Sequence, residues 1–497
     1  MISATWRRLQ TQDKTSILLF IGVLIVMVWT ANRSLTFYSN DVIYVARPAW
    51  TLGLGGTLDI GRFTPTDIAN WSFTYNGETR SDRFPGAILF AALFYAIGRP
   101  NLFTMVPAAV AAAFACAVAA TVLHRLLLGI VRPRTALGGA LIFAFGTSMW
   151  SVASDAIWTE GPVIMGLALA TWAMTRQSWV LAGLGYAFAI FSRPHTAVFA
   201  AVSGIWEGVT RRSIVPVLKV GLASALGFAG LLLWNKLNSG RWDIFPGSYG
   251  GRISGATTSG TYGQASGGER LADYSATFFS PLRGVFVYSP FLLLLLPGLV
   301  RAWRIAPSWV RSTAIAGVVY LVVQLAGNSW FGGGGIFGYR LILPSLFAWW
   351  PLLALSWDQW TAKRTWSRYI FYALTAASVW WFAQGSLVFR LDYVNANPNE
   401  FLEWQSWNVP RILDWAGPFG WLAAALFVAG LFFILSLVPD AEQPGESGND
   451  GRTKAQATGS APVRAEDKDL AVAAIVPGAK GSSKRRSGGP DANKKRR

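Results

Sequence analysis

The chain has 497 residues, of which 53% are hydrophobic and only 14% are charged, and it contains 25 tryptophans. Soluble domains carry about 25% charged residues, so this composition excludes most water-soluble enzyme classes. The net charge is +18, while one cysteine and two histidines exclude a disulfide framework and leave little scope for a metal site.

Long apolar runs follow one another from residue 16 to residue 437. A helix needs about 20 mainly apolar residues to cross a bilayer, so these runs predict an all-α integral membrane fold with about twelve transmembrane helices. The first span is interpreted as an uncleaved anchor, because no small-residue cleavage site precedes Asn32. The predicted spans are centred on residues 16–31, 101–123, 136–153, 161–177, 179–192, 194–209, 216–235, 285–303, 311–327, 341–357, 369–387 and 417–437.

The basic residues predict the orientation of this bundle. With a cytoplasmic N-terminus, the inner ends and loops hold 16 basic residues against three acidic ones, whereas the outer loops hold 15 basic and 14 acidic residues. Because positive residues collect on the cytoplasmic side, we expect a multi-pass protein of a bacterial inner membrane with both termini in the cytoplasm. The inner basic residues are Arg7, Arg8, Lys14, Arg125, Arg132, Arg134, Arg176, Arg211, Arg212, Lys219, Arg301, Arg304, Arg311, Lys363, Arg364 and Arg368.

The composition changes after the last apolar run. Residues 1–438 are expected to form a polytopic transmembrane domain, and residues 439–497 a disordered basic cytoplasmic tail, because the surroundings of the tail's Lys/Arg clusters are too rich in Gly, Ser, Pro and Ala to build a core. The tail is interpreted as a solvated segment near anionic lipid headgroups, with a specific partner site as the alternative. Since topology accounts for the excess positive charge, nucleic acid is not expected as a partner.

Almost no ionisable residue falls in the middle of a predicted span, whereas ion-coupled transporters keep such residues there. The polar residues collect instead in three long outer loops, at 32–100, 236–284 and 388–416. This distribution favours an enzyme that works at the outer membrane face.

The first outer loop carries Asp41 about ten residues past the first span, and Asp82 and Arg83 before an apolar stretch at 87–97. That stretch is too short to span a bilayer and predicts a helix on the membrane surface. A carboxylate at this depth can reach a lipid-borne substrate, so Asp41 is a candidate catalytic residue. The alternative is that Asp41 caps the N-terminus of a helix.

A run of four glycines at 332–335 leads through Tyr339 to Arg340, just before the span at 341–357. Glycines allow close approach of backbone to a ligand, and an arginine at headgroup level can bind a phosphate through two hydrogen bonds. Arg340 and Tyr339 are therefore candidate substrate-binding residues. The alternative is a flexible turn with an interfacial aromatic belt and an arginine that extends to the interface.

Asp82 in the first outer loop is a further candidate substrate-binding residue. Three more candidates lie near the outer ends of spans. Asp155 and Glu160 could order a substrate, but a water-exposed acidic turn is the favoured interpretation of both. Arg193 could contact phosphate, although an interfacial anchor is favoured. The Gly/Ser-rich loop 236–284 suits either a mobile lid or a connector, and residues 392–411 suit either acceptor contacts or an interfacial amphipathic segment.

In order along the chain, these elements resemble the GT-C superfamily of membrane glycosyltransferases, in particular the bacterial branch akin to protein O-mannosyltransferases and the lipid A aminoarabinose transferase. The resemblance extends from the first span to about Leu437. It rests on the first-loop acid, the Arg83-Phe84-Pro85 element, Thr147-Ser148-Met149-Trp150, Ser192-Arg193-Pro194, residues 280–290, and the Phe-Gly-x-Arg element that ends at Arg340.

The resemblance implies transfer of a sugar from a polyprenyl phosphate to a glycan, lipid or protein acceptor at the outer face, with inversion and without a cofactor. It places Asp41 at the catalytic acidic position and Arg83 where relatives carry a phosphate-binding lysine. Two departures are that Asn40-Asp41 replaces a pair of acidic residues and Arg83-Phe84-Pro85 replaces Lys-Pro-Pro. The alternatives are a polyprenyl-lipid flippase and a non-catalytic protein of the same fold.

Overall fold

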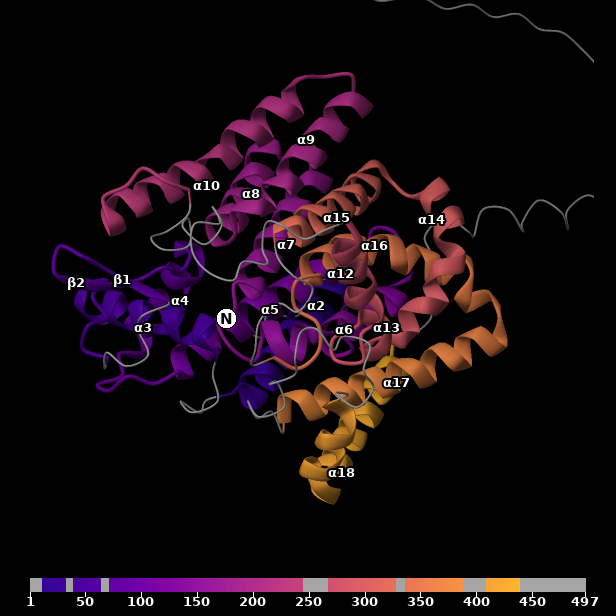
Figure 1. Ribbon diagram of the computed structural model, residues 1–497. Coiled ribbons are helices and arrows are strands. Elements are labelled where there is room, and N and C mark those ends of the chain that lie inside the picture. The colour runs from indigo at the N-terminus through magenta and orange to yellow at the C-terminus, as the bar shows by residue number, and fades with distance from the viewer. Residues whose placement is uncertain are drawn as a thin grey trace, which may run out of the picture. The chain divides into compact units, whose positions relative to one another are not determined.

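The structure is a computed structural model of the chain, and it describes residues 11–32, 39–63, 71–244, 267–327, 336–387 and 408–438. Within these ranges the chain is almost entirely helical (Figure 1). The α-helices are α2 (Thr11–Thr30), α3 (Asn40–Gly55), α4 (Pro85–Gly98), α5 (Val106–Leu127), α6 (Pro133–Phe145), α7 (Glu160–Thr175), α8 (Trp179–Ser192), α9 (Ala197–Thr210), α10 (Val215–Ser239), α12 (Gly267–Phe279), α13 (Val285–Tyr288), α14 (Leu299–Ile305), α15 (Ser308–Gly327), α16 (Leu343–Gln359), α17 (Thr365–Leu387) and α18 (Asn408–Ser436).

Each of the twelve predicted spans falls on helical structure. Among the described residues, five helical segments are long and apolar enough to cross a membrane by themselves: Gln12–Thr30, Val106–Leu127, Val215–Ser239, Ser308–Gly327 and Gly417–Ser436. The other predicted spans fall on helices that are shorter, interrupted or less apolar. Length and hydropathy therefore predict a helical membrane bundle more reliably than they predict the number of its transmembrane helices.

Two predicted spans are not continuous α-helices. The 136–153 prediction is wrong as one helix, because α6 ends at Phe145 and a π-helix, η2 (Met149–Ala153), follows after Gly146. The 285–303 prediction is divided among α13, the 3-10 helix η4 (Pro290–Gly298) and α14. Proline lacks a backbone donor and crowds the preceding turn, so Pro290 and Pro297 explain the second interruption.

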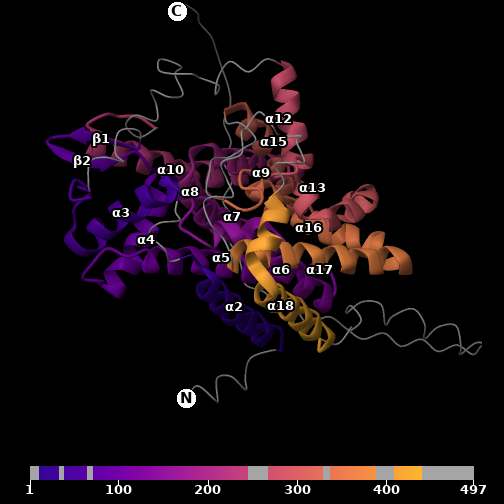
Figure 2. The ribbon, with the colours of Figure 1, turned by 60° about the horizontal axis from the view of Figure 1, so that its bottom comes forward.

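The loop at 32–100, which was predicted to face outward, contains α3, a β-hairpin and α4, and the hairpin was not predicted. Strands β1 (Ser72–Tyr75) and β2 (Glu78–Ser81) pair antiparallel, with Ser72 opposite Ser81. The turn residues Asn76 and Gly77 both have positive φ, as a two-residue hairpin turn with right-handed strand twist requires. Figures 1 and 2 both show the hairpin beside α3 and α4.

Small residues bring the helices behind this loop into close contact. A Cβ atom on Gly166 of α7 would lie 2.9 Å from the Gly185 carbonyl oxygen of α8, so a larger residue there would push the two helices apart. Such contacts replace the hydrophobic driving force that soluble helices use, because lipid is as apolar as the helix surface. Gly86 of α4 packs in the same way directly against Ser192, which places the end of α8 beside the first outer loop.

Several predicted features fall partly or wholly outside the described residues. The glycine run 332–335, the tail 439–497 and most of residues 392–411 lie outside them. In the 236–284 loop, α12 occupies its C-terminal part, so that part is a helix rather than an irregular connector, and residues 245–266 are outside the description.

Candidate active site

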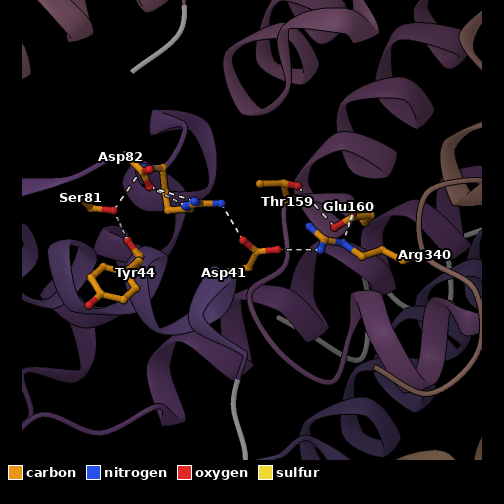
Figure 3. Close-up of polar contacts among 8 residues, drawn as sticks. Asp41, Tyr44, Ser81, Asp82, Thr159, Glu160 and Arg340 are labelled. Atoms are coloured by element: carbon orange, nitrogen blue, oxygen red, sulfur yellow. Dashed lines mark hydrogen bonds and ion pairs between the residues drawn. The ribbon is translucent and has the colours of Figure 1, made fainter. Parts of the chain in front are cut away.

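Asp41 lies in the first turn of α3, two positions after the N-cap residue Ser39. The alternative in which Asp41 is the N-cap is therefore wrong. Its carboxylate instead bridges two arginines: Oδ1 accepts a hydrogen bond from Arg83 Nη1 at 2.6 Å, and Oδ2 accepts one from Arg340 Nη1 at 2.8 Å. Figure 3 shows Asp41 lying between the Asp82 side and the Glu160–Arg340 side of the cluster.

The hairpin delivers Arg83 and Asp82 to this position. Arg83 donates from Nε to Asp82 Oδ1 at 2.9 Å, and its guanidinium lies 4.2 Å from the centre of the Trp71 ring. The Ser81 hydroxyl donates to the Tyr44 carbonyl at 2.6 Å, which ties the end of β2 to α3. Asp82 and Arg83 are both buried, so the two charges face each other in a site that excludes most water.

Arg340 is positioned by the irregular segment that follows α6. The backbone amide of Tyr339 donates to the Ser148 hydroxyl at 2.9 Å, and the Ser151 hydroxyl donates to the Phe337 carbonyl at 2.7 Å. The Thr147–Trp150 motif and its π-helix thus hold the backbone that leads to Arg340. Short π-helical segments are frequent at functional sites, where they redirect side chains.

Glu160 and Arg193 belong to the same cluster. The Glu160 Oε1 atom accepts from Arg340 Nε at 2.8 Å and from Arg193 Nη1 at 2.7 Å. Glu160 is fully buried and Arg193 is 8% exposed, so the favoured interpretations of a water-exposed acid and an interfacial anchor are both wrong. The cause is Pro194, which holds Arg193 in an extended conformation and turns its side chain off the end of α8.

The six groups joined by these contacts balance in charge, and a further buried arginine, Arg283, lies near Arg340. Three guanidinium groups (Arg83, Arg193 and Arg340) meet three carboxylates (Asp41, Asp82 and Glu160) through the contacts above. Burial alone would raise the pKa of Asp41, but the positive charges of Arg83, Arg340 and Arg193 outweigh burial and hold its pKa below the ordinary value. Burial would likewise raise the pKa of Glu160, which Arg193 and Arg340 lower. Both carboxylates are therefore ionised at neutral pH.

Asp155 and Tyr339 lie apart from the Asp41 bridge. Asp155 is 5% exposed rather than in water, which is again a correction. Its Oδ1 atom accepts from the backbone amide of Asn32 at 3.0 Å, and burial raises its pKa well above the ordinary value despite that bond. The Tyr339 hydroxyl is paired with Ser289 at 2.8 Å in the core, where it supports the backbone next to Arg340.

Several contributors to the cluster were not named from the sequence. Trp158 lies 4.1 Å from the Arg340 guanidinium, and Tyr320 hydrogen bonds to Arg193. Arg283 is 4% exposed, and burial, together with the nearby Arg340 charge, lowers its pKa to about 9, so it stays protonated at neutral pH. Arg283 lies in the 280–290 motif, and its position beside Pro281 and Gly284 was the only available signal.

Metal binding was not expected. Within the part of the chain that the structure describes, no group of three or more His, Cys, Asp or Glu side chains could hold a metal ion. The expectation that the reaction needs no metal remains a prediction.

Among the solved structures that are similar to this chain are two of ArnT from Cupriavidus metallidurans. The structure bound to undecaprenyl phosphate is 14% identical, with a TM-score of 0.53, and the match covers 84% of this chain and 72% of that one. The apo structure is 13% identical, with a TM-score of 0.50, and covers 84% and 75%. The chain shares the fold of ArnT. No family model matches the chain, and no curated protein sequence matches it.

The likeness to ArnT confirms the predicted all-α membrane fold. The chain is a multi-pass membrane protein. At this degree of identity the likeness concerns the fold, so what the site does has to be argued from its own chemistry.

Proposed function

We propose that the protein is a glycosyltransferase that moves a sugar from a polyprenyl phosphate to an acceptor hydroxyl at the outer membrane face, with inversion at the anomeric carbon. The observation that carries the proposal is the Asp41 bridge. One carboxylate at the N-terminus of α3 lies between two arginines from segments 42 and 299 residues away along the chain.

The inventory of charged groups suits a phosphate leaving group. Glycosidases use two carboxylates because a sugar alkoxide must be protonated as it leaves. A departing phosphate is a weak base and needs cations instead. Arg83, Arg193 and Arg340 supply them, each within hydrogen-bonding distance of Asp41 or Glu160. ArnT, which shares the fold, was crystallised with undecaprenyl phosphate, and this supports the same class of donor here.

The proposed step is a direct displacement. The acceptor O–H bond breaks and its proton passes to the Asp41 carboxylate, while the acceptor oxygen forms a bond to the anomeric carbon. The bond between that carbon and the phosphate oxygen breaks, and its electron pair leaves with the polyprenyl phosphate. Arg83 and Arg340 stabilise the charge on the departing phosphate.

The same arginines regulate how basic Asp41 is. While both of its oxygens accept hydrogen bonds from Arg83 and Arg340, Asp41 is a poor base, because its proton affinity is low. A donor phosphate would compete for these guanidinium groups and weaken their hold on the carboxylate. Binding of the donor would thereby raise the pKa of Asp41 toward the value that proton transfer requires.

The location of the reaction follows from charge. The excess of Lys and Arg in the predicted inner loops supports an outward-facing site in a bacterial inner membrane, with both termini in the cytoplasm. We extend the proposal to a catalytic domain at 1–438 and a basic tail at 439–497. The sugar and the acceptor, whether glycan, lipid or protein, are left open.

The test uses a deletion strain complemented with wild type, Asp41→Asn or Glu78→Gln. Glu78 is a matched control because it is also paired with an arginine, Arg80, in the same outer loop but is 40% exposed and outside the cluster. The same sugar should be missing from the glycans or cell envelope of the deletion strain and of the strain that carries Asp41→Asn. It should be present again in the strain that carries Glu78→Gln. Restoration of the sugar by Asp41→Asn would remove Asp41 as the base.

A carrier that moves the lipid without chemistry is the competing function, and Asp41 separates the two. A carboxylate between two phosphate-binding arginines opposes anion binding, so a simple carrier has no use for it. Purified Asp41→Asn protein should bind undecaprenyl phosphate at least as tightly as wild type and yet transfer no sugar. Unchanged lipid movement by the variant, with no sugar transfer by wild type, would favour the carrier.

A further inference from the structure

Each of the two arginines that bridge Asp41 lies over a tryptophan ring. The central carbon of the Arg83 guanidinium group is 4.2 Å from the centre of the Trp71 ring. The same carbon of Arg340 is 4.1 Å from the centre of the Trp158 ring. A guanidinium group is planar and carries its N–H donors in that plane. Since these donors point to the carboxylates described above, the rings contact a face of each group and leave an edge toward Asp41, as Figure 3 shows for Arg340.

Both tryptophans are held by contacts that do not involve the Asp41 carboxylate. The Trp71 carbonyl accepts a hydrogen bond from the Asp82 backbone amide at 3.2 Å, which attaches Trp71 to the residue after β2. The Trp158 side chain is 3% exposed and belongs to the apolar core formed with α3 and α4. The two rings therefore stay in place when Asp41 loses its hydrogen bonds to the arginines.

A donor phosphate would compete with Asp41 for the N–H donors at these edges. Phosphate, like carboxylate, accepts hydrogen bonds from an arginine in the plane of the guanidinium group. Exchange of those bonds removes the contacts by which Asp41 fixes Arg83 and Arg340. The contact with the indole ring is not exchanged, because the ring lies against the face and the phosphate binds at the edge.

We propose that Trp71 and Trp158 are positioning residues for the donor phosphate. They hold Arg83 and Arg340 in place when the phosphate displaces the Asp41 carboxylate. Contacts between a cation and an aromatic ring are strongest where water is excluded, and the two arginines are only 9% and 8% exposed. The inference rests on the proposed function for the identity of the anion, a polyprenyl phosphate, but its test does not require sugar transfer.

The first experiment measures binding of undecaprenyl phosphate to the purified full-length protein in detergent by native mass spectrometry. Trp71→Leu and Trp158→Leu should each weaken binding roughly 3- to 30-fold, the range that a desolvated contact between a cation and a ring supplies. Trp71→Phe and Trp158→Phe keep a ring face and should bind more tightly than the leucine variants. Trp172→Leu is the matched control, because Trp172 of α7 lies under Arg176 at 3.7 Å, outside the Asp41 cluster, and it should leave binding unchanged.

A double-mutant cycle separates a positioning role from simple packing. Asp41→Asn alone should leave binding of undecaprenyl phosphate at least as tight as in wild type. Combined with Trp71→Leu, it should bind about fivefold more weakly than the two single effects together predict, because neither the carboxylate nor the ring then holds Arg83. The cycle with Trp158→Leu should show the same coupling, whereas the cycle with Trp172→Leu should be additive.

Additive cycles for both tryptophans overturn the proposal, and so do leucine variants that bind as tightly as Trp172→Leu. Melting temperatures show whether each variant is folded, and because Trp71 is only half-buried, its variants remain the test if those of Trp158 do not fold. Wild type that binds undecaprenyl phosphate but transfers no sugar would contradict the proposed function alone. Wild type that does not bind this lipid would overturn both.

Discussion

The Asp41 cluster and the arginine cluster at the start of α6, Arg132 and Arg134, differ in what surrounds their charges. In the Asp41 cluster, three buried arginines meet three carboxylates at hydrogen-bonding distance. At the start of α6, the described ion pair joins Arg132 to Asp358 at 3.9 Å, and the Arg132 side chain is 41% exposed. The first cluster therefore contains buried counter-ions, whereas the ion pair at the start of α6 is partly exposed to water.

This difference has an energetic consequence. Buried charges are tolerated only when they are paired, because removal of either partner leaves an uncompensated charge in a medium of low dielectric constant. Exposed charges keep most of their hydration, so their pairs contribute little. The Asp41 cluster must therefore form as a unit, and a ligand that takes an arginine from it also releases a carboxylate.

The largest expected effect is on chemistry. Asp41→Asn removes the proposed base and should lower the rate of sugar transfer by about 10²–10⁴-fold, the usual contribution of a general base. The variant should still bind undecaprenyl phosphate, because Arg83 and Arg340 remain and no longer share their hydrogen bonds with a carboxylate. Transfer kinetics and lipid binding measured on the same preparation separate the two effects, and Glu78→Gln serves as the control.

The next effect compares the two clusters directly through stability. Arg340→Gln leaves Asp41 and Glu160 short of a cation and should lower the free energy of unfolding by about 3–5 kcal/mol. Arg132→Gln at the start of α6 should lower the free energy of unfolding by only about 0–1 kcal/mol. Denaturation in mixed micelles measures both. Adding Glu160→Gln to Arg340→Gln should recover part of the loss, and equal losses from the two single arginine variants would contradict the distinction between the clusters.

The pH dependence sharpens the role of the paired cations. A carboxyl group whose pKa is lowered by folding contributes stability that is present above its ordinary pKa and is lost as the pH falls through its folded value. Asp41 is such a group, so its carboxylate stays ionised above about pH 5. In that range kcat/KM should not fall through protonation of Asp41. Arg193→Gln removes a cation that lowers the Asp41 pKa without touching Asp41, so it should move the acidic limb of the profile to higher pH.

An acidic limb that stays in place in Arg193→Gln would show that this cation does not influence Asp41. The Arg304→Gln variant removes the same charge on α14, outside the Asp41 cluster, and its profile should match that of wild type.

The smallest effect concerns Asp155, a buried carboxyl group without an arginine among its described contacts. Its pKa is raised by burial, so its contribution to stability is present at low pH and is lost as the pH rises through the folded pKa. Asp155→Asn keeps an oxygen that can accept a hydrogen bond from the Asn32 backbone amide, so it should not destabilise the protein at neutral pH. As the pH rises, the variant should become more stable relative to wild type. Melting temperatures between pH 5 and pH 8.5 test this, and a clear loss throughout the range would contradict it.

Much of the fold could be predicted from the chain alone. Apolar runs of about 20 residues indicate membrane helices whatever their partners, because the bilayer imposes the same requirement on each. The interruptions at Gly146 and Pro290 were harder to place, since hydropathy does not report them. The hairpin carried an Asn76-Gly77 signal that is specific for a two-residue turn, and it was missed because the expectation for this loop was helical.

The site was predictable only in part. Asp41 and Arg340 were candidates because each lies next to an apolar run at headgroup level, and Arg83 was a candidate through the family resemblance. The structure brings all three together. The places of Glu160 and Arg193 were misjudged, because both lie at the ends of helices, where a single sequence does not distinguish water from a neighbouring helix. Gly86 of α4 packs closely against Ser192 at the end of α8, next to Arg193, and Glu160 is buried by its contacts with Arg193 and Arg340.

The sequence by itself determined that this chain is a membrane bundle whose charges collect at its two faces, since the cost of burying polar groups in lipid acts on each segment separately. Only the tertiary structure decided which of those charges meet. Asp41 and Arg340 are 299 residues apart along the chain, and no local rule relates them. Their contact depends on the packing of α3, the π-helix after α6 and the approach to α16, and that packing is a property of the whole bundle.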